Sequence, residues 1–534
     1  MDLLTELAAL NLAPALAQSL SATLDKAQHD AKLVEQLKEQ AAEDAQRIAR
    51  DTERIRTADI KIAALTLELA HHKRIRFANK SEAFSPEQRE LFQECWNTDL
   101  AAMEAQLDQL ASDIAPPKKP KKPTGRQPLP AHLPRIEHRH EPASCACGQC
   151  GGDLVKVGED VSEQLDVEPA RFFVHRHIRP QYACRACETV TAEPVPAAVI
   201  DGGLGAPGLH AWIVTQKFLD HLPLYRIEHI SARHGAPIAR STLADWVGKI
   251  GIALQPLADR LAELLRQRSI LHADETPVPQ LDPGAGKTKR AYLWAYRSND
   301  LCTGPPIIVF EYQPSRAGRH VQDFLRDWRG QLMVDDYSGY KALFASGITE
   351  LGCFAHARRK FFELHAANQS PIAEEALRRI GELYAIESVG RDLGADARAR
   401  LRREQALPLL DELHAWLRAT RMTAAEGSGI AKAIDYNLKR WPALARYATN
   451  GVLPIDNNPI ENAIRPIAIG KKNWLFAGSE RAGRRAAAIQ GLLGTAKLNG
   501  FDPYAWLKDT LEKLPAWPNS RLDELLPLRA PAIT

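Results

Sequence analysis

The chain has 534 residues, of which 25% are charged, and 69 basic residues against 66 acidic ones give a formal net charge of +3. This length predicts several domains, and the sequence has no uninterrupted apolar run long enough to span a bilayer. Because the charges nearly balance, the overall composition does not indicate nucleic-acid binding. Only local clusters of charge can indicate such a partner.

Residues 1–115 are predicted to be helical and to contain a coiled coil. Two of the positions that would form its seam hold Asp44 and Asp51, which are polar faults. The apolar seam positions recur at seven-residue steps: Val34, Ala41, Ile48, Ile55, Ile62 and Leu69. A long helix packed within its own chain is the alternative, but we favour self-association into a homodimer or a higher oligomer.

Residues 116–137 form a basic, proline-rich segment, PPKKPKKPTGRQPLPAHLP. Prolines prevent helix and sheet, so an extended, solvated linker is predicted. Contact with phosphates is a second role for its lysines, because each neutralised phosphate releases counterions.

Residues 138–192 are predicted to form a small zinc-binding domain. Cys147 and Cys150 make one CxxC pair and Cys184 and Cys187 another, at the two ends of a strand-rich segment. Four thiolates with no open position are typical of a structural zinc site. Cys145 could replace Cys147. The chain is long and its first residues lack a basic leader, so we expect a reducing cytoplasm rather than a disulfide framework.

Residues 193–268 are predicted to be helical, with a helix-turn-helix around HGAPIARSTLADWVGKIG. Ser241 or Thr242 would cap the second helix. Its buried stripe is expected at i, i+3, i+4 and i+7, namely Leu243, Trp246, Val247 and Ile250. Arg240 and Lys249 remain outside this stripe as candidate DNA contacts. Many helix pairs of this kind do not touch DNA, which is the alternative.

Residues 269–485 change to apolar runs separated by turns. Three strands, a helix, a fourth strand and a short strand that enters a helix predict an α/β domain of the ribonuclease-H type. The stretch of about 370–447 is helical in texture and is predicted to be an insertion in this domain. Residues 486–534 are expected to form a helical tail.

Three acidic stretches lie in this domain: ILHADETPV, LMVDDYSGY and IDNNPIENAIRP. Alternation along the first strand places Asp274 on one face and Glu275 on the other. In the second stretch either Asp335 or Asp336 could face a metal. Glu461 is near the start of a helix that Asn458 could cap. Carboxylates on separate elements are what a site for two Mg²⁺ ions requires.

Two basic clusters are candidate phosphate contacts. One is Arg358, Arg359 and Lys360, for which a solvated helix face is the alternative; the other is Lys471 and Lys472, just before Trp474. His356 either contacts the reacting region or is a hydrogen-bonded core histidine. Cys302 and Cys353 are expected to be buried apolar fillers.

Taken together, the CxxC pairs, HADETPV, VDDYSGY, CFAHARRKF, DNNPIENAIRPIAIGKKNWLFAGSE and FDPYAWL resemble the bacterial insertion sequence 66 transposases, members of the DDE superfamily. The resemblance covers nearly the whole chain. It implies a multidomain α+β protein whose ribonuclease-H-like core uses Asp274, Asp335 and Glu461 for Mg²⁺-dependent cleavage at element ends and strand transfer into target DNA. Asp336 stands where the family usually has glycine, and Phe354 where tryptophan is common.

The resemblance also implies partners: the terminal inverted repeats of the element, target DNA, and small accessory proteins of the same element. No membrane partner is expected, and binding to DNA would bring the protein to the nucleoid. Two rival functions stay open from the sequence. One is a DNA-binding protein without catalysis; the other is a nuclease or resolvase that cuts without joining.

Overall fold

The computed structural model describes residues 129–141, 152–168, 171–282, 285 and 287–529, together with scattered helical positions between Thr23 and Thr52. Most of the predicted coiled-coil region, the basic run of the linker, and Cys145, Cys147 and Cys150 lie outside the described residues. Two of the described seam positions, Val34 and Ile48, are exposed. All elements named below belong to one compact unit, within residues 122–534.

A four-stranded sheet comes first in this unit. Its strands are β1 (Arg135–Arg139), β2 (Leu154–Glu168), β3 (Arg171–Cys184) and β4 (Val190–Ala192). The long strands β2 and β3 pair antiparallel, and β1 runs parallel to β3. Leu165 and Val167 of β2 and Val174 of β3 are buried near the turn of this hairpin, where they join a core shared with the helices that follow.

Four helices follow the sheet: α4 (Pro207–Phe218), α5 (Leu224–Arg233), α6 (Arg240–Ala253) and α7 (Gln255–Arg266). The stripe predicted for α6 is buried. The predicted cap is wrong, because α6 begins at Arg240 and leaves Ser241 and Thr242 inside the helix. The carboxylate of Glu228, on α5, accepts the backbone N–H of Arg240 at 2.9 Å instead. A side chain from the preceding helix therefore caps the start of α6, in place of a hydroxyl from the helix's own first turn.

A five-stranded sheet forms the middle of the unit. Its strands are β5 (Ile270–Asp282), β6 (Lys287–Ser298), β7 (Ile308–Gln313), β8 (Gln331–Val334) and β9 (Thr349–Gly352), in the order β7-β6-β5-β8-β9. β6 is antiparallel to both neighbours, whereas β5, β8 and β9 are parallel. The elements between β7 and β9 are α8 (Arg319–Leu325), the 3₁₀ turn η1 (Ser338–Tyr340) and α9 (Lys341–Ala345).

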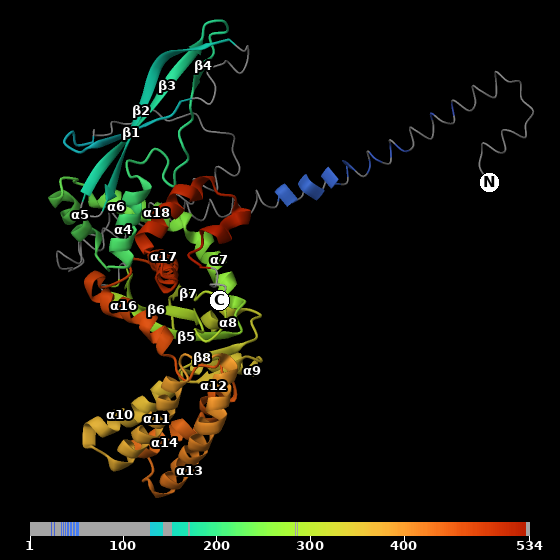
Figure 1. Ribbon diagram of the computed structural model, residues 1–534, viewed down its shortest axis with the longest axis vertical. Helices are drawn as coiled ribbons and strands as arrows, with labels where there is room; N and C mark the ends of the chain where they lie inside the picture. The colour runs from blue at the N-terminus through green and yellow to red at the C-terminus, as the bar shows by residue number, and fades with distance from the viewer. Residues whose placement is uncertain are drawn as a thin grey trace, which may run out of the picture. The chain divides into compact units, whose positions relative to one another are not determined.

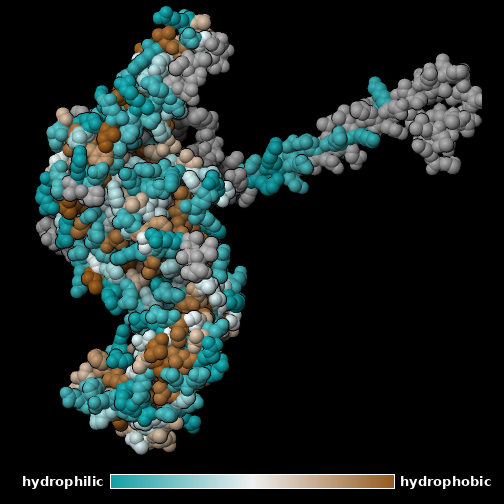
Figure 2. All heavy atoms as spheres, in the orientation of Figure 1, coloured by the Kyte–Doolittle hydropathy of each residue, from teal (hydrophilic) through white to brown (hydrophobic). Residues whose placement is uncertain are grey.

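A group of helices separates β9 from the last part of the chain. It comprises α10 (Phe354–Asn368), α11 (Pro371–Val389), α12 (Ala395–Leu401), the π-helical turn η2 (Arg402–Ala406), α13 (Leu407–Thr423), α14 (Gly429–Lys439), α15 (Trp441–Ala445) and η3 (Arg446–Thr449). Phe361, Leu383 and Leu413 of these helices belong to a core that also includes Ile270 of β5 and Met333 of β8. Figure 2 shows hydrophobic side chains at the surface of this group. Met422, on α13, is 87% exposed.

The last helices return to the five-stranded sheet. They are α16 (Asn458–Trp474), α17 (Glu480–Leu498), α18 (Pro503–Lys513) and the 3₁₀ turns η4 (Leu514–Ala516) and η5 (Asn519–Leu525). α17 lies against β7 (Figure 1), where Thr495 Oγ1 donates to the carbonyl of Ile308 at 3.0 Å. Ile460, Ile464 and Ile467 of α16 pack with Val278 on β5. Among the described helices none has the length and apolar character needed to cross a bilayer.

Candidate active site

Asp274 lies on β5 and is half-buried. Alternation puts it on the same face of the sheet as Val278, the face that α16 covers. Burial, together with the negative charges of Glu275, Asp335 and Glu461, raises the pKa of Asp274 to about 8. Such a carboxyl group is partly protonated near neutral pH, and a nearby cation would favour its charged form.

Asp335 directly follows β8, the parallel neighbour of β5. His272 pairs with Met333 in the register of these strands, so Asp274 and Asp335 each stand two residues beyond that pair. Parallel strands lie about 4.8 Å apart, which brings the two aspartates to the same edge. Asp335 Oδ1 accepts the backbone N–H of Tyr337 at 2.9 Å.

Asp336 has a different set of partners from Asp335. Its Oδ1 is 3.3 Å from Nη1 of Arg440, a buried arginine that also contacts Glu350 at 2.6 Å. Asp336 therefore belongs to an ion-pair network, whereas Asp335 contributes to the electrostatic field at Asp274. Asp335 thus stands beside Asp274 in the strand register, whereas Asp336 pairs with Arg440.

Glu461 lies in the first turn of α16. Asn457, the residue before this helix, connects the turn to β5. Asn457 Nδ2 donates to the carbonyl of Ala273 at 2.9 Å, and its Oδ1 is 2.9 Å from His272 Nδ1. Its backbone N–H donates to Cys353 Sγ at 3.2 Å. Because Asn457 is fully buried, these bonds fix the start of α16 beside the residue that precedes Asp274.

The prediction that Asn458 caps this helix is wrong, because Asn458 is the first residue of the helix. Asp456 Oδ1 accepts the backbone N–H of Asn458 at 3.1 Å, and Asp456 Oδ2 accepts the hydroxyl of Tyr384 at 2.8 Å. The helix start is therefore held by a carboxylate that is itself tied to α11.

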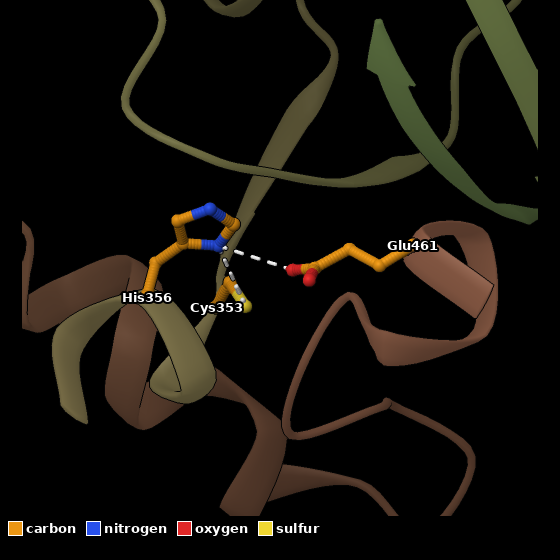
Figure 3. A group of neighbouring side chains, drawn as sticks. All are labelled: Cys353, His356 and Glu461. Carbon is orange, nitrogen blue, oxygen red and sulfur yellow. Dashed lines mark hydrogen bonds and ion pairs between the residues drawn. The ribbon is translucent and has the colours of Figure 1, made fainter. Parts of the chain in front are cut away.

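Glu461 also faces the N-terminal turn of α10 (Figure 3). His356 Nδ1 is 3.5 Å from Glu461 Oε1 and 3.4 Å from Cys353 Sγ. Arg359 Nη2 is 3.3 Å from Glu461 Oε2.

Cys353 is buried as expected, but it is more than an apolar filler, since its sulfur accepts hydrogen bonds beside a carboxylate. Cys302 is only half-buried, and Asn299 Nδ2 contacts its sulfur at 3.5 Å.

Glu275 is a further acidic residue next to this group. Its side chain, 1% exposed, receives Arg316 Nε on Oε1 at 2.6 Å and the Tyr340 hydroxyl on Oε2 at 2.8 Å. The Arg316 guanidinium also lies 3.8 Å from the ring centre of Tyr337. We did not predict these partners. The one available signal was a second carboxylate directly after Asp274 in an apolar strand.

The three carboxylates of Asp274, Asp335 and Glu461 are brought to one region but not into a tight cluster. Among the described residues, the group whose metal-binding atoms all lie within 4.8 Å of one another is Cys353, His356 and Glu461. The negative charges of Asp335 and Glu461 both act on Asp274, where they contribute to its raised pKa.

Cationic side chains surround this acidic region. Arg358, Arg359 and Lys360 are exposed on α10, and Arg359 contacts Glu461. Next to Asp335 a cleft of about 540 Å³ opens, and its basic lining residues are Lys341, Lys439, Arg440 and Arg446. Arg440 is buried and ion-paired, so a polyanion could approach the carboxylates along the exposed Lys341 and Lys439.

The other candidate DNA contacts differ in their partners. Lys472 is exposed, and Lys471 Nζ donates to the carbonyl of Pro277 at 2.9 Å. On α6, Arg240 Nη2 is 3.0 Å from Glu228 and Lys249 Nζ is 3.0 Å from Asp245. The positive charge of α6 is therefore already balanced by acidic neighbours.

In the candidate zinc domain, only Cys184 and Cys187 fall among the described cysteines of the two pairs. Leu154, four residues after Cys150 in the sequence, pairs with Cys184 in the antiparallel register of β2 and β3.

Comparison with known protein families gives four matches. Residues 202–485, just over half of the chain, match the family described as Transposase IS66 family. Residues 144–188 match the zinc-finger binding domain of transposase IS66, and residues 491–528 the IS66 C-terminal element. Residues 64–137 match a domain described as transposase C of IS166 homeodomain. The zinc-finger match indicates a structural zinc.

Curated relatives support the same assignment. The chain is 38% identical over 523 residues to the uncharacterized protein y4qI of Sinorhizobium fredii, covering 93% of this chain and 95% of that protein. It is 34% identical over 491 residues to the uncharacterized protein y4hP of the same organism, covering 88% of each. These family matches define a transposase, a DNA-cleaving enzyme. The chain belongs to the IS66 family of transposases.

Proposed function

We propose that residues 269–485 form a ribonuclease-H-like catalytic core that cuts DNA at the ends of an insertion sequence and joins those ends to target DNA. The sheet order β7-β6-β5-β8-β9, with only β6 antiparallel, supports this fold. In chain order the central strand is the first, and the first and fourth strands lead to Asp274 and Asp335. The helices from α11 to η3 then correspond to the insertion predicted at about 370–447, between the second and third carboxylates.

The residues present fit a pair of Mg²⁺ ions held by Asp274, Asp335 and Glu461. Oxygen is the ligand Mg²⁺ prefers, and Glu461 Oε1 is buried without a hydrogen bond. A pair of ions needs ligands on both sides of the pair. The carboxylates that hold two ions can therefore lie farther apart than those that hold one. When bound, such ions activate water or a 3′-hydroxyl and stabilise charge on the phosphate.

The chain's own residues have separate parts in this scheme. Asp274 and Asp335 would hold the ions from the side of the sheet. Glu461 would hold them from α16, whose start is hydrogen-bonded to β5 through Asn457. Arg316 keeps Glu275 out of the metal site by pairing with it. Arg359, with a side chain 52% exposed, can exchange Glu461 for a DNA phosphate when the site is filled.

DNA is the partner that the basic surroundings favour. We assign its nearest phosphates to the exposed run Arg358–Lys360 and to the cleft beside Asp335. Arg240 and Lys249 stay weaker candidates because each is ion-paired. Cys147 and Cys150 would complete a zinc site with Cys184 and Cys187, since the strand that follows Cys150 pairs with Cys184. Exposed seam positions such as Val34 are consistent with self-association.

The observation that carries the proposal is that separate elements bring three carboxylates to one region. Asp274 is on β5, Asp335 directly follows the neighbouring strand β8, and Glu461 lies in a helix whose start is hydrogen-bonded to β5. The test incubates purified protein, Mg²⁺ and labelled DNA from the element ends, with and without the small accessory proteins of the same element. Cleavage followed by strand transfer is expected for the wild type. Cleavage without transfer would support a nuclease, and a mobility shift without cleavage would support a DNA-binding protein.

Neighbouring aspartates provide a matched pair of variants for this assay. Asp335→Asn should abolish cleavage while DNA binding persists, because it removes a ligand. Asp336→Asn changes the same chemical group one residue away, on the Arg440 side, and should retain cleavage within roughly tenfold. The reverse result would transfer the ligand role to Asp336.

A further inference from the structure

A second metal-binding group shares one residue with the proposed magnesium site. Cys353 Sγ, His356 Nδ1 and a carboxylate oxygen of Glu461 all lie within 4.8 Å of one another. No other three His, Cys, Asp or Glu side chains in the described part of the chain bring their ligand atoms so close. Figure 3 shows the imidazole between the thiol and the carboxylate, with dashed lines from Nδ1 to both.

The positions of these residues follow from two helix starts. Cys353 is the residue before α10, and His356 lies in its first turn, three residues later. This spacing places both side chains on the same side of the helix. Glu461 enters from the first turn of α16. The three ligands therefore come from rigid elements, which already hold them at distances that need little adjustment.

The donor set selects a different ion from the one that suits the aspartates. A thiolate, an imidazole and a carboxylate are the ligands of Zn²⁺, commonly three of them with a fourth position open. Soft sulfur ligands do not suit Mg²⁺, which takes oxygen. The site would thus bind zinc or another thiophilic divalent cation and reject magnesium.

Glu461 connects this group to catalysis. Its Oε1 faces His356, and its Oε2 takes Arg359. We propose that Cys353, His356 and Glu461 form an inhibitory Zn²⁺ site, whose occupation withdraws Glu461 from the magnesium ligands and stops DNA cleavage. The inhibitory half of this proposal rests on the proposed function; the existence of the metal site does not.

The surroundings of the thiol suit a metal ligand. The backbone N–H of Asn457 donates to Cys353 Sγ at 3.2 Å. Cysteine binds a metal ion as the thiolate, and this donor would stabilise the negative charge on the sulfur.

Metal binding is tested without any DNA. Full-length protein whose zinc-finger site is already filled, with one zinc per chain, is titrated with Co²⁺ and followed by absorption. The wild type should bind a second equivalent and show a thiolate-to-cobalt charge-transfer band. Cys353→Ser should lose that band. Cys302→Ser, which removes a half-buried thiol outside the group, should retain it.

A second variant guards against loss of the fold in Cys353→Ser. His356 is partly exposed, and His356→Gln keeps the thiol while removing the imidazole. It should weaken Co²⁺ binding by roughly tenfold or more while the melting temperature stays near that of the wild type. Absence of a second equivalent in the wild type, or a band that persists in Cys353→Ser, would overturn the metal site.

Inhibition is tested separately, in Mg²⁺-dependent cleavage with added Zn²⁺. The wild type should be inhibited at the Zn²⁺ concentrations that fill the site, and higher Mg²⁺ should restore activity. If the second equivalent binds but cleavage is unaffected, the inhibitory role is wrong. If no cleavage occurs under any condition, the proposed function fails, while the cobalt spectra still decide the metal site.

Discussion

Replacing Asp274 by Asn should stabilise the magnesium-free protein although it destroys the proposed metal site. The pKa of Asp274 is about 8 in the folded protein, far above its ordinary value of 3.8. The folded state therefore retains a proton that the unfolded chain releases as the pH rises through about 4. Stability contributed by this carboxyl group is complete below that pH and is lost progressively up to pH 8.

The size of the effect follows from the same shift. Each pKa unit corresponds to about 1.4 kcal/mol, so at pH 7 the buried carboxyl group costs at most about 4 kcal/mol relative to a group that does not ionise. Asn has nearly the same shape and no charge. The variant should gain a part of this free energy, and its stability should no longer fall between pH 5 and pH 8 on account of this position.

Urea unfolding at pH 5, 6, 7 and 8 measures this difference, in magnesium-free buffer without chelator so that zinc stays bound. Magnesium titration of the wild type should show affinity that rises about tenfold per pH unit up to pH 8, because the ion displaces the proton. Asp336→Asn serves as the adjacent exposed control. A wild type whose magnesium affinity is constant from pH 6 to pH 8, with Asp274→Asn less stable at pH 8, would refute the reasoning.

Three further predictions concern the framework around the site. Asn457→Ala leaves the carbonyl of Ala273 without its buried partner and should lower the free energy of unfolding by about 3 kcal/mol, whereas an unchanged melting curve would contradict the anchoring role. Arg402→Ala removes a buried arginine paired with Glu387 at 2.6 Å and should cost about 3–5 kcal/mol; Arg403→Ala, beside it, should cost little in the same urea titration. Cys184→Ser should release the zinc of the finger, measured by elemental analysis as the loss of one metal ion per chain, and retention of the full amount would exclude Cys184 as a ligand.

Local patterns in the sequence predicted the strands and buried stripes well. The apolar run before Asp274 is β5, and the stripe Leu243, Trp246, Val247 and Ile250 is buried as its spacing required. These features depend on a period within one element, which neighbouring residues determine. α17 spans Glu480–Leu498, on both sides of the domain boundary predicted at residue 485. The helix packs against β7, which is distant in sequence, so no local pattern indicates where this domain ends.

Partners distant in sequence could not be predicted. The helix starts of α6 and α16 are held by Glu228 and Asp456 and not by the side chains we had chosen. Arg316 and Tyr340, which enclose Glu275, are 41 and 65 residues away from it. No periodic pattern connects such residues, since only the completed sheet brings them together.

The distribution of cations explains why Asp274 is the residue on which a bound metal should act most strongly. Glu275 has Arg316, Asp336 has Arg440, and Glu461 has Arg359 and, when protonated, His356. Within the described residues no ion pair involves Asp274 or Asp335, and it is at Asp274 that burial and three neighbouring carboxylates raise the pKa. A divalent cation would supply the missing positive charge, and it would do so beside the carboxylate whose ionisation is otherwise the most unfavourable in the group.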